Sequence, residues 1–164
     1  MVNNTEDFVE LIQSHLNEYI HAADRKSSIL LTAHIAFLGL FGKALMNESS
    51  SIALASEGLL SAVMAGATVI SGLIAGLFAG LVVYPRTPET DSGYMLWSSI
   101  INKQKAEYHD ELQNLGEDEI TEEMIDENYQ LANVAEDKYK YLRYSLISTA
   151  AMVIFAVISF AVVV

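Results

Sequence analysis

Residues 21 to 42 read HAADRKSSILLTAHIAFLGLFG, and the stretch changes character in its middle. It begins as a charged segment and continues as an apolar run with no glycine or proline before Gly39. Nothing in it interrupts a helix, so the sequence predicts one unbroken helix that carries Asp24, Arg25 and Lys26 to the edge of a membrane. We expect this junction to join a cytoplasmic module to a membrane-spanning one.

Three apolar segments of the chain are long enough to cross a bilayer. Residues 59–84 carry no charged side chain over 26 positions, and residues 144–164 carry none over 21. Residues 27–46 form a third segment, which only His34 and Lys43 interrupt. About 20 apolar residues in a helix cross the hydrocarbon core of a membrane. The sequence therefore predicts an all-α integral membrane protein with three transmembrane helices and a membrane-proximal cytoplasmic helical bundle.

The predicted organisation divides one domain into six consecutive parts. They are a cytoplasmic amphipathic helix at 1–26, a first span at 27–46, an outer loop at 47–58, a second span at 59–84, a cytoplasmic helical hairpin at 85–143 and a third span at 144–164. Eight of the nine basic residues lie in the first and fifth parts, which places both of them on the cytoplasmic side. The acidic opening MVNNTEDFVE lacks the basic region of a signal peptide, so none is expected.

The net charge of −12 is concentrated in the cytoplasmic parts, where eight basic residues stand against nineteen acidic ones. This balance disfavours binding to a nucleic acid polymer, which needs a basic face. The sequence contains no cysteine, which excludes disulfides and thiolate metal sites. It also shows no Ser/His/Asp set and no glycine-rich phosphate loop, so it predicts neither an enzyme nor a bound cofactor or metal.

Three cytoplasmic helices are expected beside the spans. The first covers residues 5–26 and runs without a break into the first span. A second is expected from about Tyr94 to Leu115, with Gly116 as its stop, and a third from Thr121 directly into the last span. The apolar face predicted for the first helix comprises Phe8, Leu11, Ile12, Leu16, Tyr19, Ile20 and Ala23.

The second span carries Gly72, Gly76 and Gly80 at intervals of four residues. Glycines at this spacing form a groove into which another helix backbone packs closely. That helix can belong to a second copy of the chain, which predicts a homo-oligomer, or to another span of the same chain. Ionisable groups are otherwise scarce in the spans, and His34 can either line a water path or hydrogen-bond within the bundle.

Six of the nine basic residues lie within a few positions of a predicted membrane boundary. They are Arg25, Lys26, Arg86, Lys138, Lys140 and Arg143. Their ordinary role is to anchor the spans to lipid phosphates on the cytoplasmic side. The sharper hypothesis is that some of them hold a small anionic ligand, because a local pair of cations binds one phosphate even where the surrounding acidity repels a polyanion.

The residues along the chain also resemble a known family. Asn17, Ile20, Ala23, Asp24, Lys26 and Leu30 form the pattern N-x-x-I-x-x-A-D-x-K-x-x-x-L at the entrance to the first span. Tyr84-Pro85-Arg86 closes the second span, an aromatic-rich segment occupies residues 94–100, and the last helix carries Leu131, Lys138, Tyr139 and Leu142. In this order and spacing, from about Val9 to Leu146, the chain is similar to the Pycsar transmembrane effectors.

The resemblance implies a prokaryotic antiphage effector in the plasma (inner) membrane. In such systems a cyclase responds to infection by making a cyclic pyrimidine mononucleotide, cCMP or cUMP. The effector binds it and disrupts the inner membrane, which causes abortive infection. A ligand-binding role carries over to Asp24, Lys26, Arg86, Trp97, Lys138 and Tyr139. This chain has Ser27 where members of the family often follow the lysine with alanine.

A cyclic nucleotide presents one negative charge and one flat base. Arg86, Lys140 or Arg143 can take the phosphate, while Trp97 or a tyrosine stacks on the base. Asp24 can read the base, or it can pair with Lys26 or Arg143 and brace the junction. Two other functions stay open, a constitutive small cation channel and a membrane scaffold that docks a protein partner.

Overall fold

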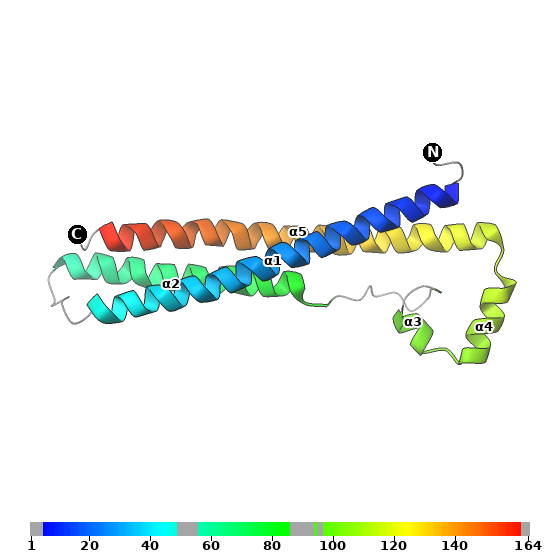
Figure 1. Cartoon of the computed structure of the whole chain (residues 1–164), viewed down its shortest axis with the longest axis horizontal. Helices are drawn as coiled ribbons and strands as arrows, with labels where there is room; N and C mark the ends of the chain where they lie inside the picture. The colour runs from blue at the N-terminus through cyan, green and yellow to red at the C-terminus, as the bar shows by residue number, and fades with distance from the viewer. Residues whose placement is uncertain (1–4, 49–55, 86–93, 95–96, 162–164) are drawn as a thin grey trace. The chain divides into compact units, whose positions relative to one another are not determined.

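The computed structural model describes residues 5–48, 56–85, 94 and 97–161 (Figure 1). Within these ranges the chain forms five helices and no strand. They are α1 (Thr5–Glu48), α2 (Ser56–Val83), α3 (Trp97–Ile101), α4 (Lys105–Asn114) and α5 (Glu117–Ala161). The three long helices α1, α2 and α5 are each long and apolar enough to cross a membrane. The prediction of an all-α protein with three transmembrane helices is confirmed.

Helices α1 and α5 each continue from a polar half into an apolar one without interruption. α1 has 44 residues and α5 has 45, so each is about 66 Å long at 1.5 Å per residue. Acidic residues occupy the first turn of both helices, where they suit the positive end of the helix dipole. The unbroken helix predicted from residue 5 through the first span is present.

The N-cap of helix α5 lies five residues earlier than predicted. Thr121 does not cap it, because its hydroxyl donates to the Glu117 carbonyl at 3.0 Å inside the helix. The cap is Gly116, whose backbone N–H donates to the Glu119 carboxylate at 2.9 Å. This is the reciprocal half of a capping box, which satisfies one of the free N–H groups at the helix start.

The single helix predicted from Tyr94 to Leu115 is wrong, because the chain breaks between α3 and α4. Gln104 is extended there, with φ −72° and ψ 142°. The break lets Lys103 reach Glu111 at 2.5 Å and lie 4.5 Å from the centre of the Tyr94 ring. Eight residues of continuous helix would instead separate Lys103 and Glu111 by about 12 Å. The contacts of Lys103 are therefore compatible with a break at Gln104 and not with one continuous helix.

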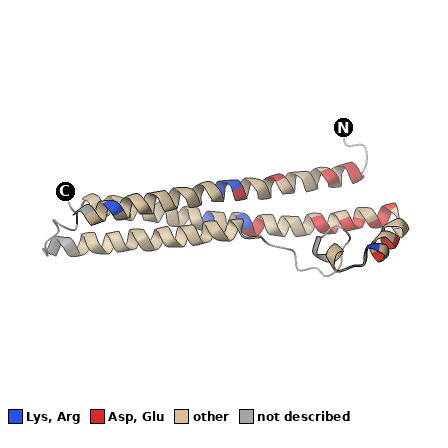
Figure 2. Ribbon diagram, turned by 60° about the horizontal axis from the view of Figure 1, so that its bottom comes forward, with Lys and Arg blue, Asp and Glu red and all other residues tan. Residues whose placement is uncertain are grey.

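The chain forms two compact units. The first, which we call the acidic unit, comprises residues 1–22 and 85–137. The second, which we call the transmembrane unit, comprises residues 23–84 and 138–164. The acidic unit carries eighteen acidic and three basic residues, a net charge of −15, whereas the transmembrane unit carries three acidic and six basic ones, a net charge of +3. Figure 2 shows this segregation along α1 and α5.

In the acidic unit the first turns of α1 pack against the polar half of α5. The Asn128 side chain donates to the Val9 carbonyl at 2.9 Å, and Gln13 donates to Glu127 at 3.0 Å. Val9 is buried here, whereas Phe8 and Leu11 of the predicted apolar face are exposed. The face of α1 that is buried here is therefore rotated relative to the predicted apolar face and is centred nearer Val9.

In the transmembrane unit, small residues let the three helices approach closely. Phe41, Ala65 and Ala156 form one apolar cluster, one residue from each long helix. Gly72 is also enclosed: a Cβ atom there would lie 2.8 Å from Leu38 and 2.9 Å from the Met152 sulfur. The packing of α2 at Gly72 is thus against α1 and α5 of the same chain.

Candidate functional site

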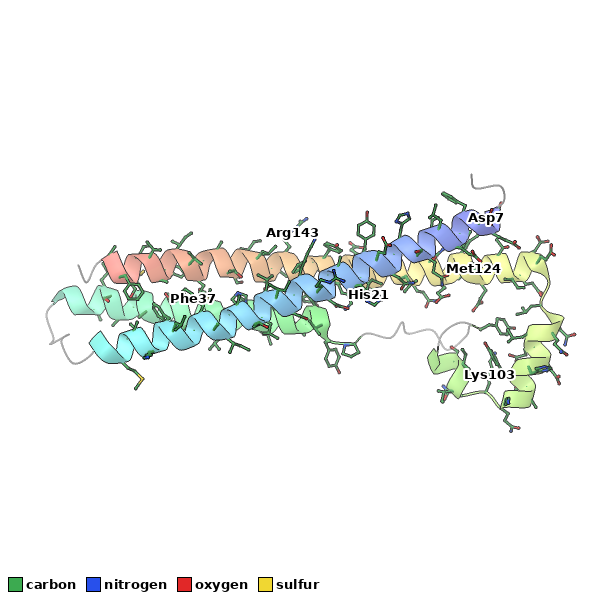
Figure 3. All side chains as sticks on the ribbon, in the orientation of Figure 1. Asp7, His21, Phe37, Lys103, Met124 and Arg143 are labelled. Atoms are coloured by element: carbon green, nitrogen blue, oxygen red, sulfur yellow. The ribbon has the colours of Figure 1, made fainter. Side chains whose placement is uncertain are left out.

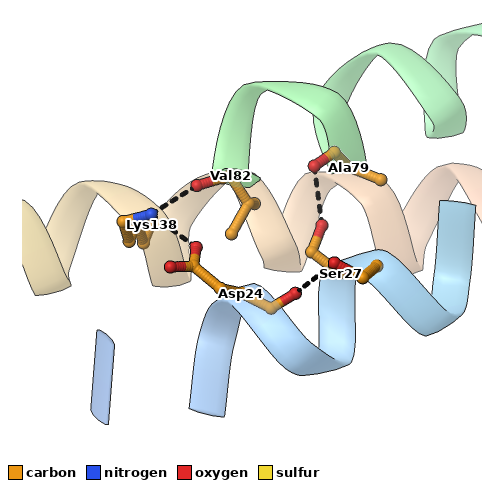
Figure 4. A network of polar contacts seen from close by, with 6 residues as sticks. Asp24, Ser27, Ala79, Val82 and Lys138 are labelled. Atoms are coloured by element: carbon orange, nitrogen blue, oxygen red, sulfur yellow. Dashed lines mark hydrogen bonds and ion pairs between the residues drawn. The ribbon is translucent and has the colours of Figure 1, made fainter. Parts of the chain in front are cut away.

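A buried lysine joins the three long helices at one end of the transmembrane unit. The Lys138 ammonium, on α5, donates to the Asp24 carboxylate of α1 at 2.5 Å and to the Val82 carbonyl of α2 at 2.6 Å (Figure 4). Lys138 is only 4% exposed, and Asp24 is partly buried. Ala23, Val82 and Leu142 form an apolar cluster at the same level.

The end of α2 explains why a cation is held there. The last helical bond runs from the Tyr84 N–H to the Gly80 carbonyl at 3.0 Å, and Pro85, the next residue, has no N–H with which to continue the helix. Carbonyls of the last turn lack partners within the helix, and the negative end of the helix dipole lies there. Lys138 supplies a donor to one of these carbonyls and a counter-charge to Asp24, so the buried ammonium is compensated twice.

Two buried serines extend this contact along α2. Ser27 of α1 donates to the Ala79 carbonyl at 2.7 Å, and Ser145 of α5 donates to the Ala75 carbonyl at 2.9 Å. The carbonyls of residues 75, 79 and 82 lie on one face of α2, because they are spaced by four and three residues. One face of α2 is therefore tied to both neighbouring helices over two turns.

Four further cations on the surface of the transmembrane unit lie within five residues of Asp24 or Lys138 along α1 and α5. Arg25, Lys26, Lys140 and Arg143 are exposed, and within the described ranges none of them forms an ion pair. Lys26 lies 5.9 Å from the centre of the Tyr139 ring, a cation–π contact between α1 and α5. We call Arg25, Lys26, Lys140 and Arg143 the basic collar. Arg143 is labelled in Figure 3. The collar offers unpaired positive charge to an anion.

The structure brings six of the eight predicted ligand-binding residues into the transmembrane unit. They are Asp24, Lys26, Lys138, Tyr139, Lys140 and Arg143. Arg86 and the side chain of Trp97 lie outside the described residues. The expected pairing of Asp24 with Lys26 or Arg143 is wrong, because Asp24 pairs with Lys138. Lys138 differs from the exposed cations in lying beside the Val82 carbonyl of α2 as well as the Asp24 carboxylate.

Sequence reasoning missed Ser27 and the Val82 carbonyl. Ser27 lies four residues after Ala23 and seven before His34, on the stripe of α1 that the structure buries. That helical spacing is the sequence signal that could have identified Ser27 as a buried residue. The role of a backbone carbonyl leaves no trace in residue type, so only the three-dimensional arrangement reveals Val82.

Of the three glycines, Gly72 has the closest neighbours. A Cβ at Gly76 would lie 3.8 Å from Leu31, and one at Gly80 would meet nothing within 4 Å. His34 is buried in the span and lies 2.8 Å from the Thr149 hydroxyl, measured from Nε2. The Thr149 hydroxyl in turn donates to the Ser145 carbonyl at 2.7 Å, so it accepts from His34.

A cavity of about 580 Å³ in the acidic unit is unsuited to an anion. Its lining comprises Tyr94, Glu107, Asp110, Glu111, Asn114, Leu115 and Glu119. The nearby Lys103 is already paired with Glu111, whose hydrogen bond raises the pKa of the lysine. Four carboxylates around one space repel a phosphate. No group of three or more His, Asp or Glu side chains suited to a metal ion occurs in the described part of the chain.

The chain matches known proteins over nearly its whole length. The sequence profile of the Pycsar effector protein domain matches residues 8–164. The Pycsar effector protein SaPycTM of Staphylococcus aureus is 28% identical over 147 residues, which cover 88% of this chain and 87% of that protein. No solved structure matches the chain. With three membrane-spanning helices and this match, the chain belongs to the Pycsar effector family of antiphage defence effectors and is a prokaryotic membrane protein.

Proposed function

We propose that this protein binds a cyclic pyrimidine mononucleotide, cCMP or cUMP, at the basic collar and then disrupts the inner membrane, causing abortive infection. The observation that carries the proposal is the collar itself, four exposed cations without an ion pair among the described residues. They lie on α1 and α5 at the end of the transmembrane unit where α2 terminates.

Charge selects the collar over the acidic unit as the phosphate site. The net charge of −15 on the acidic unit opposes an anion, while residues 23–26 and 138–143 hold five cations against the single carboxylate of Asp24. Arginine binds a phosphate through two parallel N–H···O bonds, which favours Arg25 and Arg143 for this task. Lys138 is less suited to the first contact with the phosphate, because its ammonium is buried and already holds two acceptors.

Base recognition and assembly complete the proposal. Tyr139 offers an aromatic ring beside Lys26, and Arg86 and Trp97 remain candidates from the sequence. A homo-oligomer would form through the outward side of α2 near Gly80, where a Cβ would meet nothing within 4 Å. Several three-helix units assembled together would disrupt a larger area of the bilayer than a single unit.

Dye leakage from liposomes that contain the purified protein tests this function. cCMP, cUMP, cAMP and cGMP are added separately, and we expect leakage with one pyrimidine nucleotide. Arg143→Gln and Lys140→Gln should reduce the response about tenfold or more, since a charge-assisted hydrogen bond contributes ~1.5–3 kcal/mol. Lys105→Gln is the matched control, because Lys105 is an exposed lysine in the acidic unit.

The other functions give different outcomes in the same assay. Leakage without any nucleotide would indicate a constitutive channel. A folded protein that leaves the liposomes sealed with all four nucleotides would contradict the proposal and favour a scaffold that docks a protein partner. Equal loss in Lys105→Gln and Arg143→Gln would contradict the collar as the binding site.

A further inference from the structure

The two charged residues of the pattern A-D-x-K lie at opposite edges of one helix face. Successive residues of an α-helix are separated by about 100°, so Asp24 and Lys26 flank the face of α1 that buries Ala23 and Ser27. At one edge Asp24 holds Lys138 of α5, and at the other edge Lys26 lies over the ring of Tyr139 of α5. Both edges of α1 are therefore attached to α5 through a cation.

We propose that Asp24, Lys138 and the Val82 carbonyl form an ionic latch that holds α1 and α2 against α5 in the sealed state, and that the anionic messenger opens it. This inference rests on the proposed function and concerns its regulation. Asp24 acts in it as the internal anion that occupies the cation until a phosphate arrives, and not as a contact to the base.

Competition for cations is the physical basis of the latch. A phosphate at the collar attracts Lys26 away from the Tyr139 ring and competes with Asp24 for Lys138. Each of these exchanges removes a contact between α1 and α5, and the second also weakens the attachment of the α2 end. A ligand shifts an equilibrium only by its different affinity for the two states, and here the open state offers it more free cations.

The variants Asp24→Asn and Lys138→Met test the latch. In liposomes without nucleotide, we expect either variant to leak at least about tenfold faster than the wild type, which corresponds to a shift of ~1.4 kcal/mol in the closed–open equilibrium. Calorimetry on the same proteins in nanodiscs should show that Asp24→Asn binds the messenger more tightly, because the phosphate no longer competes with a carboxylate. Lys138→Met should still bind it.

Ser61→Ala is the matched control for general weakening of the bundle. Ser61 and Ser159 exchange hydrogen bonds of 3.4 and 3.3 Å between α2 and α5, remote in sequence from the latch. This variant should remain sealed without nucleotide. Circular dichroism checks that each variant is folded. If Asp24→Asn does not fold, the leakage of Lys138→Met alone tests the latch.

The outcomes separate the latch from the proposed function. If the wild type responds to a pyrimidine nucleotide while both variants stay sealed and lose binding, Asp24 and Lys138 serve to bind the ligand and not to seal the bundle, and the latch is refuted. If the wild type responds to no nucleotide but both variants leak, the latch stands and the proposed messenger is wrong. Leakage of Ser61→Ala equal to that of Asp24→Asn would also overturn the latch.

Discussion

Lys138 is buried, and one of its acceptors is the carbonyl of Val82, which belongs to an apolar cluster with Ala23 and Leu142. Removing one partner from a buried ion pair is costly, because the remaining charge is left uncompensated. Lys138 avoids that cost through two acceptors from two different helices. Gly72 is the complementary case, a position where the absence of a side chain lets α2 approach Leu38 and Met152. Single residues thus set both the polar and the steric contacts of the transmembrane unit.

Substitution of Gly72 tests the steric contact. Gly72→Leu should lower the free energy of unfolding by about 1–3 kcal/mol, because the added carbons would overlap Leu38 and Met152 in a packed interior. Unfolding in mixed detergent measures this effect. Gly66→Leu is the control on the same helix and should change the stability little, since a Cβ at Gly66 would meet nothing within 4 Å. Equal destabilisation by both substitutions would contradict the packing described for Gly72.

Whole helices show how local and tertiary preferences combine. α1 and α5 follow the sequence pattern, because apolar residues at helical spacing agree with a long unbroken helix. α4 is mostly polar and buries none of its residues, so its boundaries depend on ion pairs and aromatic contacts from neighbouring residues. In the acidic half of α5, burial and the charge of Glu123 raise the pKa of Glu127, while the hydrogen bond from Gln13 lowers it.

The raised pKa of Glu127 predicts a pH dependence for the contact between α1 and α5. A carboxyl whose folded-state pKa is raised contributes stability below its unfolded-state pKa, and this contribution is lost as the pH rises through the folded-state pKa. Glu127→Gln should therefore raise the amide-exchange protection factors of residues 117–137 at neutral pH and reduce the change of these factors toward acidic pH. Gln13→Ala should have the opposite effect, because it removes the bond that lowers the pKa. Identical pH profiles in both variants would contradict this account.

At the scale of the whole molecule, the dominant feature is the segregation of charge. The acidic unit has a net charge of −15 and the transmembrane unit +3, so the two respond in opposite ways to an anion. The same distribution predicts the orientation, because basic residues near the ends of spans remain on the cytoplasmic side. The segment boundaries and the cytoplasmic location of residues 85–143 remain predictions.

Cysteine labelling in intact cells tests the orientation, and the absence of native cysteine makes the result unambiguous. Ser51→Cys lies in the predicted outer loop and Gln113→Cys in the predicted cytoplasmic hairpin. A membrane-impermeant maleimide should label Ser51→Cys in intact cells and Gln113→Cys only after permeabilisation. The reverse pattern would show that the protein is inserted with its N-terminus outside.

The amino-acid sequence by itself determined the class of the protein, the three spans and the continuity of α1 and α5. These properties depend on hydropathy and helical spacing, which are local and additive along the chain. The sequence also singled out the cations near the membrane boundaries, since charge is visible in residue type.

Only the tertiary structure decided which of those cations are exposed to an anionic ligand and which are already paired within the protein. Asp24 pairs with Lys138 because the end of α2 places a carbonyl beside the same ammonium, and no local pattern encodes that meeting. Lys103 likewise contacts Glu111 and Tyr94 in a chain that turns between α3 and α4, which the local helical pattern does not predict. Contacts between residues far apart in sequence depend on the packing of whole helices, which is why the ionic latch emerged only from the folded chain.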